Sequence, residues 1–195
     1  MASIRSSFQP QLDNLNREIF TLVAFDPRGY GWSRPPGRDF PEDFLLRDAR
    51  DGRDLMRALG YSRFSILGWC AGGISALLLA ATYPDDVNKA VIWGAFAYMT
   101  DTLVDTFEAL RDIDSWTFRP IVEELTTLYG EKYFRDTWNN FCDAMNAFIS
   151  NPDGNICIEA TERVTCPTLV AYGKLDGLIP EEHPLYLAEK IRNSQ

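Results

Sequence analysis

Short apolar runs alternate with helix-like segments over the first hundred residues. The runs at 20–25, 63–69 and 89–96 are rich in β-branched and aromatic residues and are bounded by Gly, Pro or charged residues. The segment 45–59 carries apolar residues at helical spacing, and 73–83 is a second apolar segment of helical length. Strand-like runs separated by helices in this way predict a parallel sheet with helices packed on it.

The alternation is interrupted after residue 100. Apolar residues form one helical face over 118–128 and a second over 134–148, and a turn cluster follows at 151–155. Two further crossover helices are the alternative, but the strand-like run that they would need between them is missing. We therefore interpret 100–155 as an inserted helical lid.

The strand and helix pattern resumes after the insertion. An apolar run at 168–173 is followed by an amphipathic helix predicted around 181–192. The whole pattern predicts an α/β fold with a doubly wound, mostly parallel sheet. The expected organisation is a first part of the core over 1–99, the helical lid over 100–155, and a second part of the core over 156–195.

Composition and charge narrow the class of partner. The chain has 195 residues, of which 46% are hydrophobic, and suits one domain with a sizeable core. Its net charge of −9 disfavours nucleic acid and anionic membranes as partners, because both repel an acidic chain. No apolar run approaches the roughly 20 residues of a membrane span, and residues 1–16 lack the apolar segment of a secretory signal. We expect an intracellular protein that acts on a small molecule.

The cysteines and the histidine give little sign of a metal site. Cys70, Cys142, Cys157 and Cys166 lack CxxC spacing, and His183 is the single histidine of the sequence, which disfavours structural zinc. Free thiols in a reducing compartment are the simpler interpretation, and the last three cysteines are expected to be packing residues. Nothing in the sequence requires a metal or an organic cofactor.

The string "GWCAGG" joins a predicted strand to a predicted helix, which is typical of a nucleophile elbow. The tight turn is expected to leave no room for side chains at Gly68 and Gly72, two positions before and after Cys70. Cys70 would then project above the sheet, with the amide N–H of Ala71 at the start of the helix. That amide is expected to stabilise an oxyanion and to lower the pKa of the thiol. An ordinary tight turn with an unreactive cysteine is the alternative.

Asp176 is the candidate acid. It follows the predicted strand 168–173 at the carboxyl edge of the sheet, where the active sites of such folds assemble. The order nucleophile, acid, histidine also matches hydrolases with this kind of elbow, although a turn-forming aspartate is an alternative. His183 lies near the start of the last predicted helix, where we expect an exposed or capping histidine more than a catalytic base.

Longer motifs make the chain similar to a known family. The strings "DPRGYGWSRPPGRDFP", "ILGWCAGGISALLLAATYP", "NPDGNIC" and "CPTLVAYGKLDGLIP" resemble the α/β-hydrolase fold family, and within it the α-amino-acid ester hydrolases of the valacyclovir hydrolase type. The likeness covers nearly the whole chain. It implies a small-molecule ester or amide substrate and a serine, aspartate and histidine triad. It places Cys70 at the serine position and Asp176 at the acid position.

The same resemblance implies departures from the family pattern. Ala71 stands where these relatives carry an aspartate that recognises the substrate's amino group, so selectivity for aminoacyl esters is expected to be lost. The family's central strand, between 20–25 and 63–69, and its last strand with the catalytic histidine have no counterpart here. The sheet is therefore expected to be incomplete, with apolar edges that close up, self-associate or take up a partner strand. The family includes a mitochondrial enzyme, so the resemblance implies mitochondria, with the cytoplasm as the alternative.

Three functions follow from these expectations. The first is an impaired carboxylic ester hydrolase that uses Cys70 with Asp176, since a missing base and a missing oxyanion donor each cost orders of magnitude in rate. The second is a non-catalytic, truncated product that binds a small ligand or regulates a relative. The third is a redox-sensitive protein in which Cys70 is oxidised.

Overall fold

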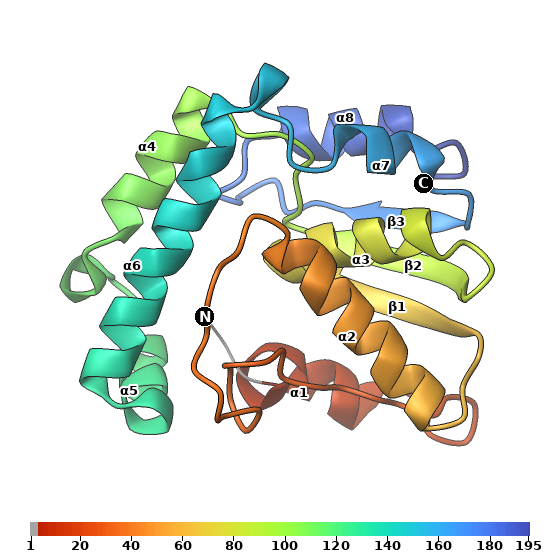
Figure 1. The fold of residues 1–195 in the computed structure, drawn as a ribbon, viewed down its shortest axis with the longest axis horizontal. Helices are drawn as coiled ribbons and strands as arrows, with labels where there is room; N and C mark the ends of the chain where they lie inside the picture. Colours follow the sequence, from red (N-terminus) through yellow and green to blue (C-terminus); the bar gives the residue numbers. More distant parts are fainter. Residues whose placement is uncertain (1–3) are drawn as a thin grey trace. The chain divides into compact units, whose positions relative to one another are not determined.

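Three parallel strands form the sheet of the structure, a computed structural model that describes residues 4–195 (Figure 1). The strands, in their order across the sheet, are β1 (Phe64–Trp69), β2 (Val87–Trp93) and β3 (Thr168–Ala171). Each overlaps one of the predicted strands, so the α/β class with a parallel sheet is confirmed. The sheet is also incomplete, as expected.

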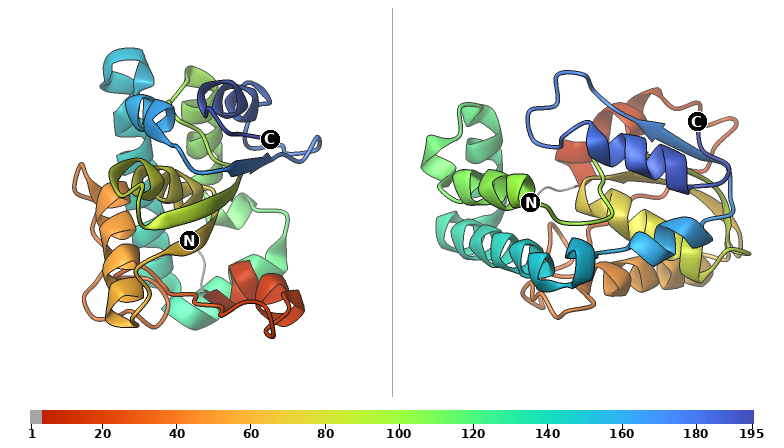
Figure 2. Two further views of the ribbon diagram at one scale, coloured as in Figure 1. Left: turned by 90° about the vertical axis from the view of Figure 1, so that its right-hand side faces the viewer. Right: turned by 90° about the horizontal axis from the view of Figure 1, so that it is seen from above.

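Helices pack beside this sheet within the unit formed by Pro41–Ala109 and Asp143–Gln195. Helix α3 follows β1 directly and contacts both β1 and β2, while α8 borders β3 (Figure 2). Both α2 and α7 pack against α3. The helices of this layer are α2 (Phe44–Ala58), α3 (Ala71–Thr82), α7 (Ile158–Arg163) and α8 (Glu182–Lys190).

The strand register separates a buried face of the sheet from an exposed one. Leu67, Val91 and Leu169 are aligned in one row across the three strands. Leu67 is 41% exposed and Leu169 47%, whereas Ile92, the next residue along β2, is fully buried. Because side chains alternate between the faces of a strand, one face lies in the core and the row of Leu67 lies on the other.

The second unit comprises the residues up to Phe40 together with Leu110–Cys142. Its helices hold the loop that carries the "DPRGYG" motif: the Tyr133 hydroxyl donates to the Gly29 carbonyl at 2.7 Å, and the Tyr129 hydroxyl accepts from the Gly31 N–H at 2.8 Å. The motif therefore has a structural role in this unit. Its helices are α1 (Ile4–Asn14), the short η1 (Ile113–Ser115), α5 (Arg119–Tyr129) and the first part of α6 (Glu131–Ala147).

The helices predicted within 100–155 are present. They are α5 and α6, and the same stretch also contains α4 (Asp101–Leu110) and the short η2 (Phe148–Ser150) and η3 (Pro152–Gly154). Two of the three boundaries between the units, at 109/110 and 142/143, fall inside this stretch. Its interpretation as a lid, and the three-part division of the chain, stay predictions.

The strand predicted at 20–25 is wrong. These residues have no regular secondary structure, and Phe20 and Phe25 at its ends are 52% and 38% exposed. An apolar, β-branched run becomes a strand only when a neighbouring strand accepts its backbone hydrogen bonds. In the described part of the chain, no neighbouring strand pairs with this run.

Candidate active site

The turn between β1 and α3 holds Cys70 in a strained backbone conformation. Cys70 has φ 54° and ψ −127°, a region that residues with a side chain rarely adopt. Main-chain bonds fix this geometry. The Cys70 N–H donates to the Trp93 carbonyl at 3.0 Å, and the Cys70 carbonyl accepts from Gly73 and Ile74 at 2.8 and 3.1 Å. The geometry is that of the nucleophile elbow predicted from the sequence.

Gly68 and Gly73 are the glycines that allow this tight turn, whereas the sequence predicted Gly68 and Gly72. A Cβ atom on Gly68 would lie 2.5 Å from the Gly72 carbonyl oxygen, and one on Gly73 would lie 2.8 Å from the Cβ of Ala95. A Cβ on Gly72 would meet nothing within 4 Å. The expectation of a collision at Gly72 is therefore wrong, because that residue contributes a backbone oxygen to the close contact while its own Cβ direction is open.

The surroundings of Cys70 make its thiol less acidic than expected. The side chain is half-buried, and loss of hydration on burial raises the pKa of the thiol above its ordinary value. The amide of Ala71 hydrogen-bonds the sulfur and lowers the pKa, but by less, and the carboxylate of Asp176 raises it further. The amide at the start of the helix thus lowers the thiol pKa as expected, but desolvation outweighs this single donor and the net shift is upward.

Asp176 lies in the loop after β3 and caps its own turn. Its Oδ1 accepts the backbone N–H groups of Leu178 at 2.9 Å and Ile179 at 3.1 Å. The side chain is half-buried and interacts electrostatically with Cys70. The structure therefore brings the two predicted site residues into one neighbourhood. Their roles as acid and nucleophile stay predictions.

His183 is buried, which corrects the expectation of an exposed or capping residue. Its ring is fully inaccessible and lies between Tyr98 and Phe96, with centroid distances of 4.8 and 5.7 Å. Neither ring nitrogen has a hydrogen-bond partner among residues 4–195. Burial lowers the pKa of the imidazole, and Glu182, whose carboxylate lies 3.8 Å away, opposes this. Nothing in this arrangement links the imidazole to Cys70.

The other three cysteines occupy packing positions, as predicted. Cys142, Cys157 and Cys166 are buried, and all four cysteines carry free thiols. Burial raises the pKa of Cys157 to about 12. The Cys157 thiol is therefore protonated in the folded chain.

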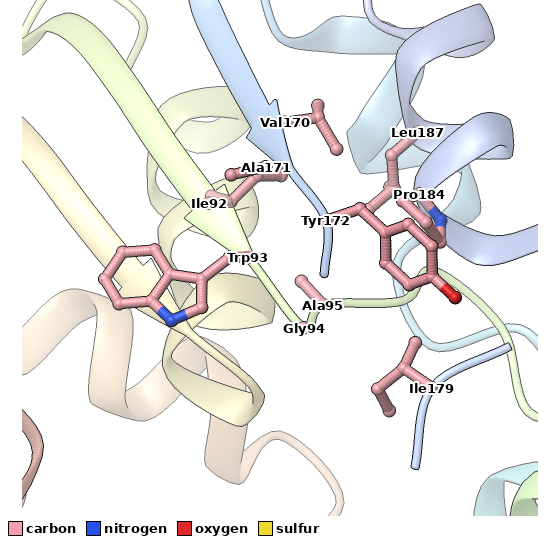
Figure 3. Close-up of a pocket in the computed structure, with 10 residues that line it drawn as sticks. All are labelled: Ile92, Trp93, Gly94, Ala95, Val170, Ala171, Tyr172, Ile179, Pro184 and Leu187. Carbon is pink, nitrogen blue, oxygen red and sulfur yellow. The ribbon is translucent and has the colours of Figure 1, made fainter. Parts of the chain in front are cut away.

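An apolar hollow at the carboxyl ends of β2 and β3 was not foreseen from the sequence. Trp93, Ala95, Tyr172, Ile179 and Leu187 are among the residues that line it (Figure 3). The sequence could indicate this hollow only through the position of its residues, because ligands of open α/β sheets bind outside the carboxyl ends of the strands.

Across 4–195, no group of three or more His, Cys, Asp or Glu side chains is arranged to hold a metal ion. Within the same range, every helix is too short or too polar to cross a membrane.

Comparison with known proteins identifies relatives over the whole chain. Residues 2–127 match the family model described as the alpha/beta hydrolase fold. The human protein named serine hydrolase BPHL is 47% identical over 195 residues, which are 100% of this chain and 67% of that protein. The mouse protein of the same name is 45% identical over the same shares.

Solved structures are similar in fold at much lower identity. A 2-hydroxy-6-oxo-6-phenylhexa-2,4-dienoate hydrolase from Rhodococcus has a TM-score of 0.78 and 21% identity, with 100% of this chain and 76% of that one covered. A hydrolase from Pseudomonas aeruginosa has a TM-score of 0.69 and 20% identity, with 96% and 74% covered. The match thus covers about three quarters of each of these two solved chains.

Proposed function

The chain belongs to the α/β-hydrolase fold family, and on that premise we propose that it is a slow carboxylic ester hydrolase whose acyl acceptor is the thiol of Cys70. The observation that carries this proposal is the strained main chain at Cys70. Strain of this kind persists only where surrounding bonds maintain it, and it is common at catalytic residues. In this chain the strained turn directs the Cys70 thiol away from the sheet and beside the amide of Ala71.

The reaction proceeds through a thioester. The Cys70 thiol loses its proton to solvent, and the Sγ atom attacks the ester carbonyl carbon while the Ala71 N–H stabilises the developing oxyanion. The carbon–oxygen bond to the leaving alcohol then breaks, which leaves an acyl group on Sγ. Water hydrolyses this thioester to a carboxylic acid and restores the thiol.

Both steps are slow in this chain. The raised pKa of the Cys70 thiol leaves little thiolate at neutral pH. Among residues 4–195, the imidazole of His183 is packed between aromatic rings and does not serve the thiol as a general base. A positioned base contributes about two to four orders of magnitude, so esters with good leaving groups are the substrates that react measurably.

Substrate selectivity is broader than in the α-amino-acid ester hydrolases that the sequence resembles. Ala71 carries no carboxylate at the position that the resemblance assigns to recognition of an amino group. A neutral methyl side chain there has no preference for a protonated amine over an alkyl group. We therefore expect simple acyl esters and aminoacyl esters to react at similar rates.

Acylation of the intact chain by p-nitrophenyl acetate tests the proposal. We expect release of p-nitrophenolate and the mass increase of one acetyl group, which peptide mapping places on Cys70. In Cys70→Ala the acetyl group is absent and release falls to the background rate of the ester in buffer, while Cys70→Ser retains the elbow and gives a slower acylation. Because the other three cysteines are buried, they serve as internal controls. Release equal to that of Cys70→Ala, with no acetyl group on Cys70, overturns the proposal.

A second candidate is a non-catalytic protein that binds a small ligand or regulates a relative. The absence of any hydrogen bond to the His183 imidazole in residues 4–195 favours it. The same experiment separates the two candidates. A folded chain that never acquires an acetyl group at Cys70 supports the non-catalytic candidate.

A further inference from the structure

The first turn of α8 carries a buried imidazole that has no hydrogen bonds. The His183 ring is fully inaccessible and lies between the rings of Phe96 and Tyr98, which follow β2. Neither Nδ1 nor Nε2 has a hydrogen-bond partner among residues 4–195. The three aromatic rings belong to the same compact unit. A buried polar ring without partners is tolerated while it is neutral, but a charged ring in that place is strongly unfavourable.

The titratable side chains around this ring are carboxylates and tyrosines. On α8, the Glu182 carboxylate lies 3.8 Å from Nε2 and is the charge that acts on the imidazole. The rings of Tyr98 and Tyr186 meet edge to face, and burial raises the pKa of both hydroxyls, so both stay neutral in mild acid. On α7, Glu159 and Glu162 interact with Tyr186. An imidazole in water titrates at about 6.5, so mild acid favours a state in which this ring is hydrated.

The loop between β3 and α8 is anchored to the core near its end. Residues 172–180 form no helix or strand, and Leu175 is almost fully exposed. Ile179 is buried and lines the apolar hollow (Figure 3). The carbonyl of Pro180 then accepts the N–H of His183 at 3.1 Å. The end of the loop is therefore tied to the helical turn that carries the buried imidazole.

We propose that His183 is a pH-sensitive anchor: its protonation in mild acid withdraws the ring from its aromatic neighbours and releases the loop 172–180. The docked ring is neutral and dry, whereas the released ring is charged and hydrated. The loop carries Asp176, so its release displaces the carboxylate that interacts with Cys70. The anchor works in the same way whether or not Cys70 reacts with esters.

Hydrogen exchange of the intact chain at pH 7 and pH 5 tests the anchor. Protection of the amides in 172–186, corrected for the effect of pH on the intrinsic exchange rate, reports the opening of this segment. In wild type it should fall about tenfold at pH 5, because a hydrated imidazole with a pKa of about 6.5 is then mostly charged while the docked ring is not. Exchange should depend only weakly on added urea, since a local opening exposes little surface.

Two variants distinguish the imidazole from its neighbours. In His183→Phe the ring cannot be charged, so protection of the segment should be the same at both pH values. Glu182→Gln is the matched control at the adjacent residue. Because this carboxylate favours the charged imidazole in the docked state, its removal should leave a fall in protection at least as large as that of wild type. Circular dichroism checks the folding of each variant, and wild type and Glu182→Gln decide the outcome if His183→Phe does not fold.

Several results overturn the proposal. They are equal protection of the wild-type segment at both pH values, a fall of the same size in folded His183→Phe, and loss of the fall in Glu182→Gln, which would assign the titration to the carboxylate. A urea dependence as steep as that of the amides in β2 would mean that the whole chain unfolds instead of the loop, and it overturns the proposal as well.

Discussion

The carbonyl oxygen of Trp93, the last residue of β2, accepts the N–H of Cys70 at 3.0 Å. This bond extends the ladder between β1 and β2 by one residue beyond the end of β1, and it does so at the residue whose φ is 54°. The neighbouring strand therefore helps to hold the turn that presents the thiol. The stability of the sheet and the geometry of the candidate site are coupled through one main-chain bond.

The glycines around the turn should respond differently to the same substitution. Gly68→Ala should lower the free energy of unfolding by about 1–3 kcal/mol, because the added Cβ would lie 2.5 Å from a backbone oxygen. Gly72→Ala should raise it by up to about 1 kcal/mol, since the site is open and alanine is the better helix former. Urea unfolding of both variants measures the difference. Equal destabilisation would show that Gly72 is also confined.

The backbone strain at Cys70 should appear as a difference in stability between the variants Cys70→Gly and Cys70→Ala. Cys70→Gly should be more stable than Cys70→Ala by about 1 kcal/mol, because glycine adopts a positive φ without a Cβ conflict. Both replacements remove the thiol, so the comparison isolates the backbone. Thermal unfolding of the pair provides the measurement. A more stable alanine variant would mean that the turn relaxes when the sulfur is removed.

The thiols should differ in their reaction with iodoacetamide as pH rises. Burial raises the pKa of Cys70, so its alkylation rate should still be increasing above the pH at which an ordinary thiol has levelled off. Cys157, whose pKa is raised to about 12, should stay unmodified in the folded chain. Mass spectrometry of each peptide at a series of pH values reports both residues. A plateau for Cys70 near neutral pH would contradict the prediction.

The buried His183 should make the folded chain less stable in mild acid. Burial lowers the pKa of the folded imidazole, whereas the unfolded chain titrates at about 6.5. The unfolded state therefore binds more protons as pH falls below that value, and stability decreases until the pH passes the folded pKa. Above about pH 7 the effect is absent.

His183→Phe supplies the comparison, because phenylalanine fits among the rings of Tyr98 and Phe96 and does not titrate. The variant should lose less stability than wild type between pH 7 and 5, measured by urea unfolding at each pH. Other acidic and basic groups affect both proteins alike. If the free energy of unfolding changed equally with pH in the two proteins, His183 would be hydrogen-bonded or solvated in solution.

Much of the fold follows from local sequence pattern. The three strands and the helices α2, α3, α5, α6 and α8 are found where apolar periodicity predicts them, because strand and helix periods are properties of short segments. The run 20–25 has the composition of a strand, yet a strand also needs a neighbour to accept its hydrogen bonds. Composition alone gives no information about that neighbour.

The candidate site shows the same division between local and distant causes. The elbow at Cys70 is local, since glycines within a few residues determine the turn. The acidity of the thiol is not determined by the turn alone, because burial and the distant carboxylate of Asp176 raise its pKa. The burial of His183 beside Phe96 likewise results from packing between distant segments.

The bonds that hold the turn involve main-chain atoms alone, and this separates two kinds of selection at position 70. A change of side chain there leaves the donors and acceptors of Cys70, Trp93 and Gly73 in place, so serine, cysteine or alanine can be exchanged with little effect on folding. The same exchange decides whether a nucleophile is present at all. Evolution can therefore turn the chemistry of this position on or off in one step, while the protein around it persists and remains available for another use.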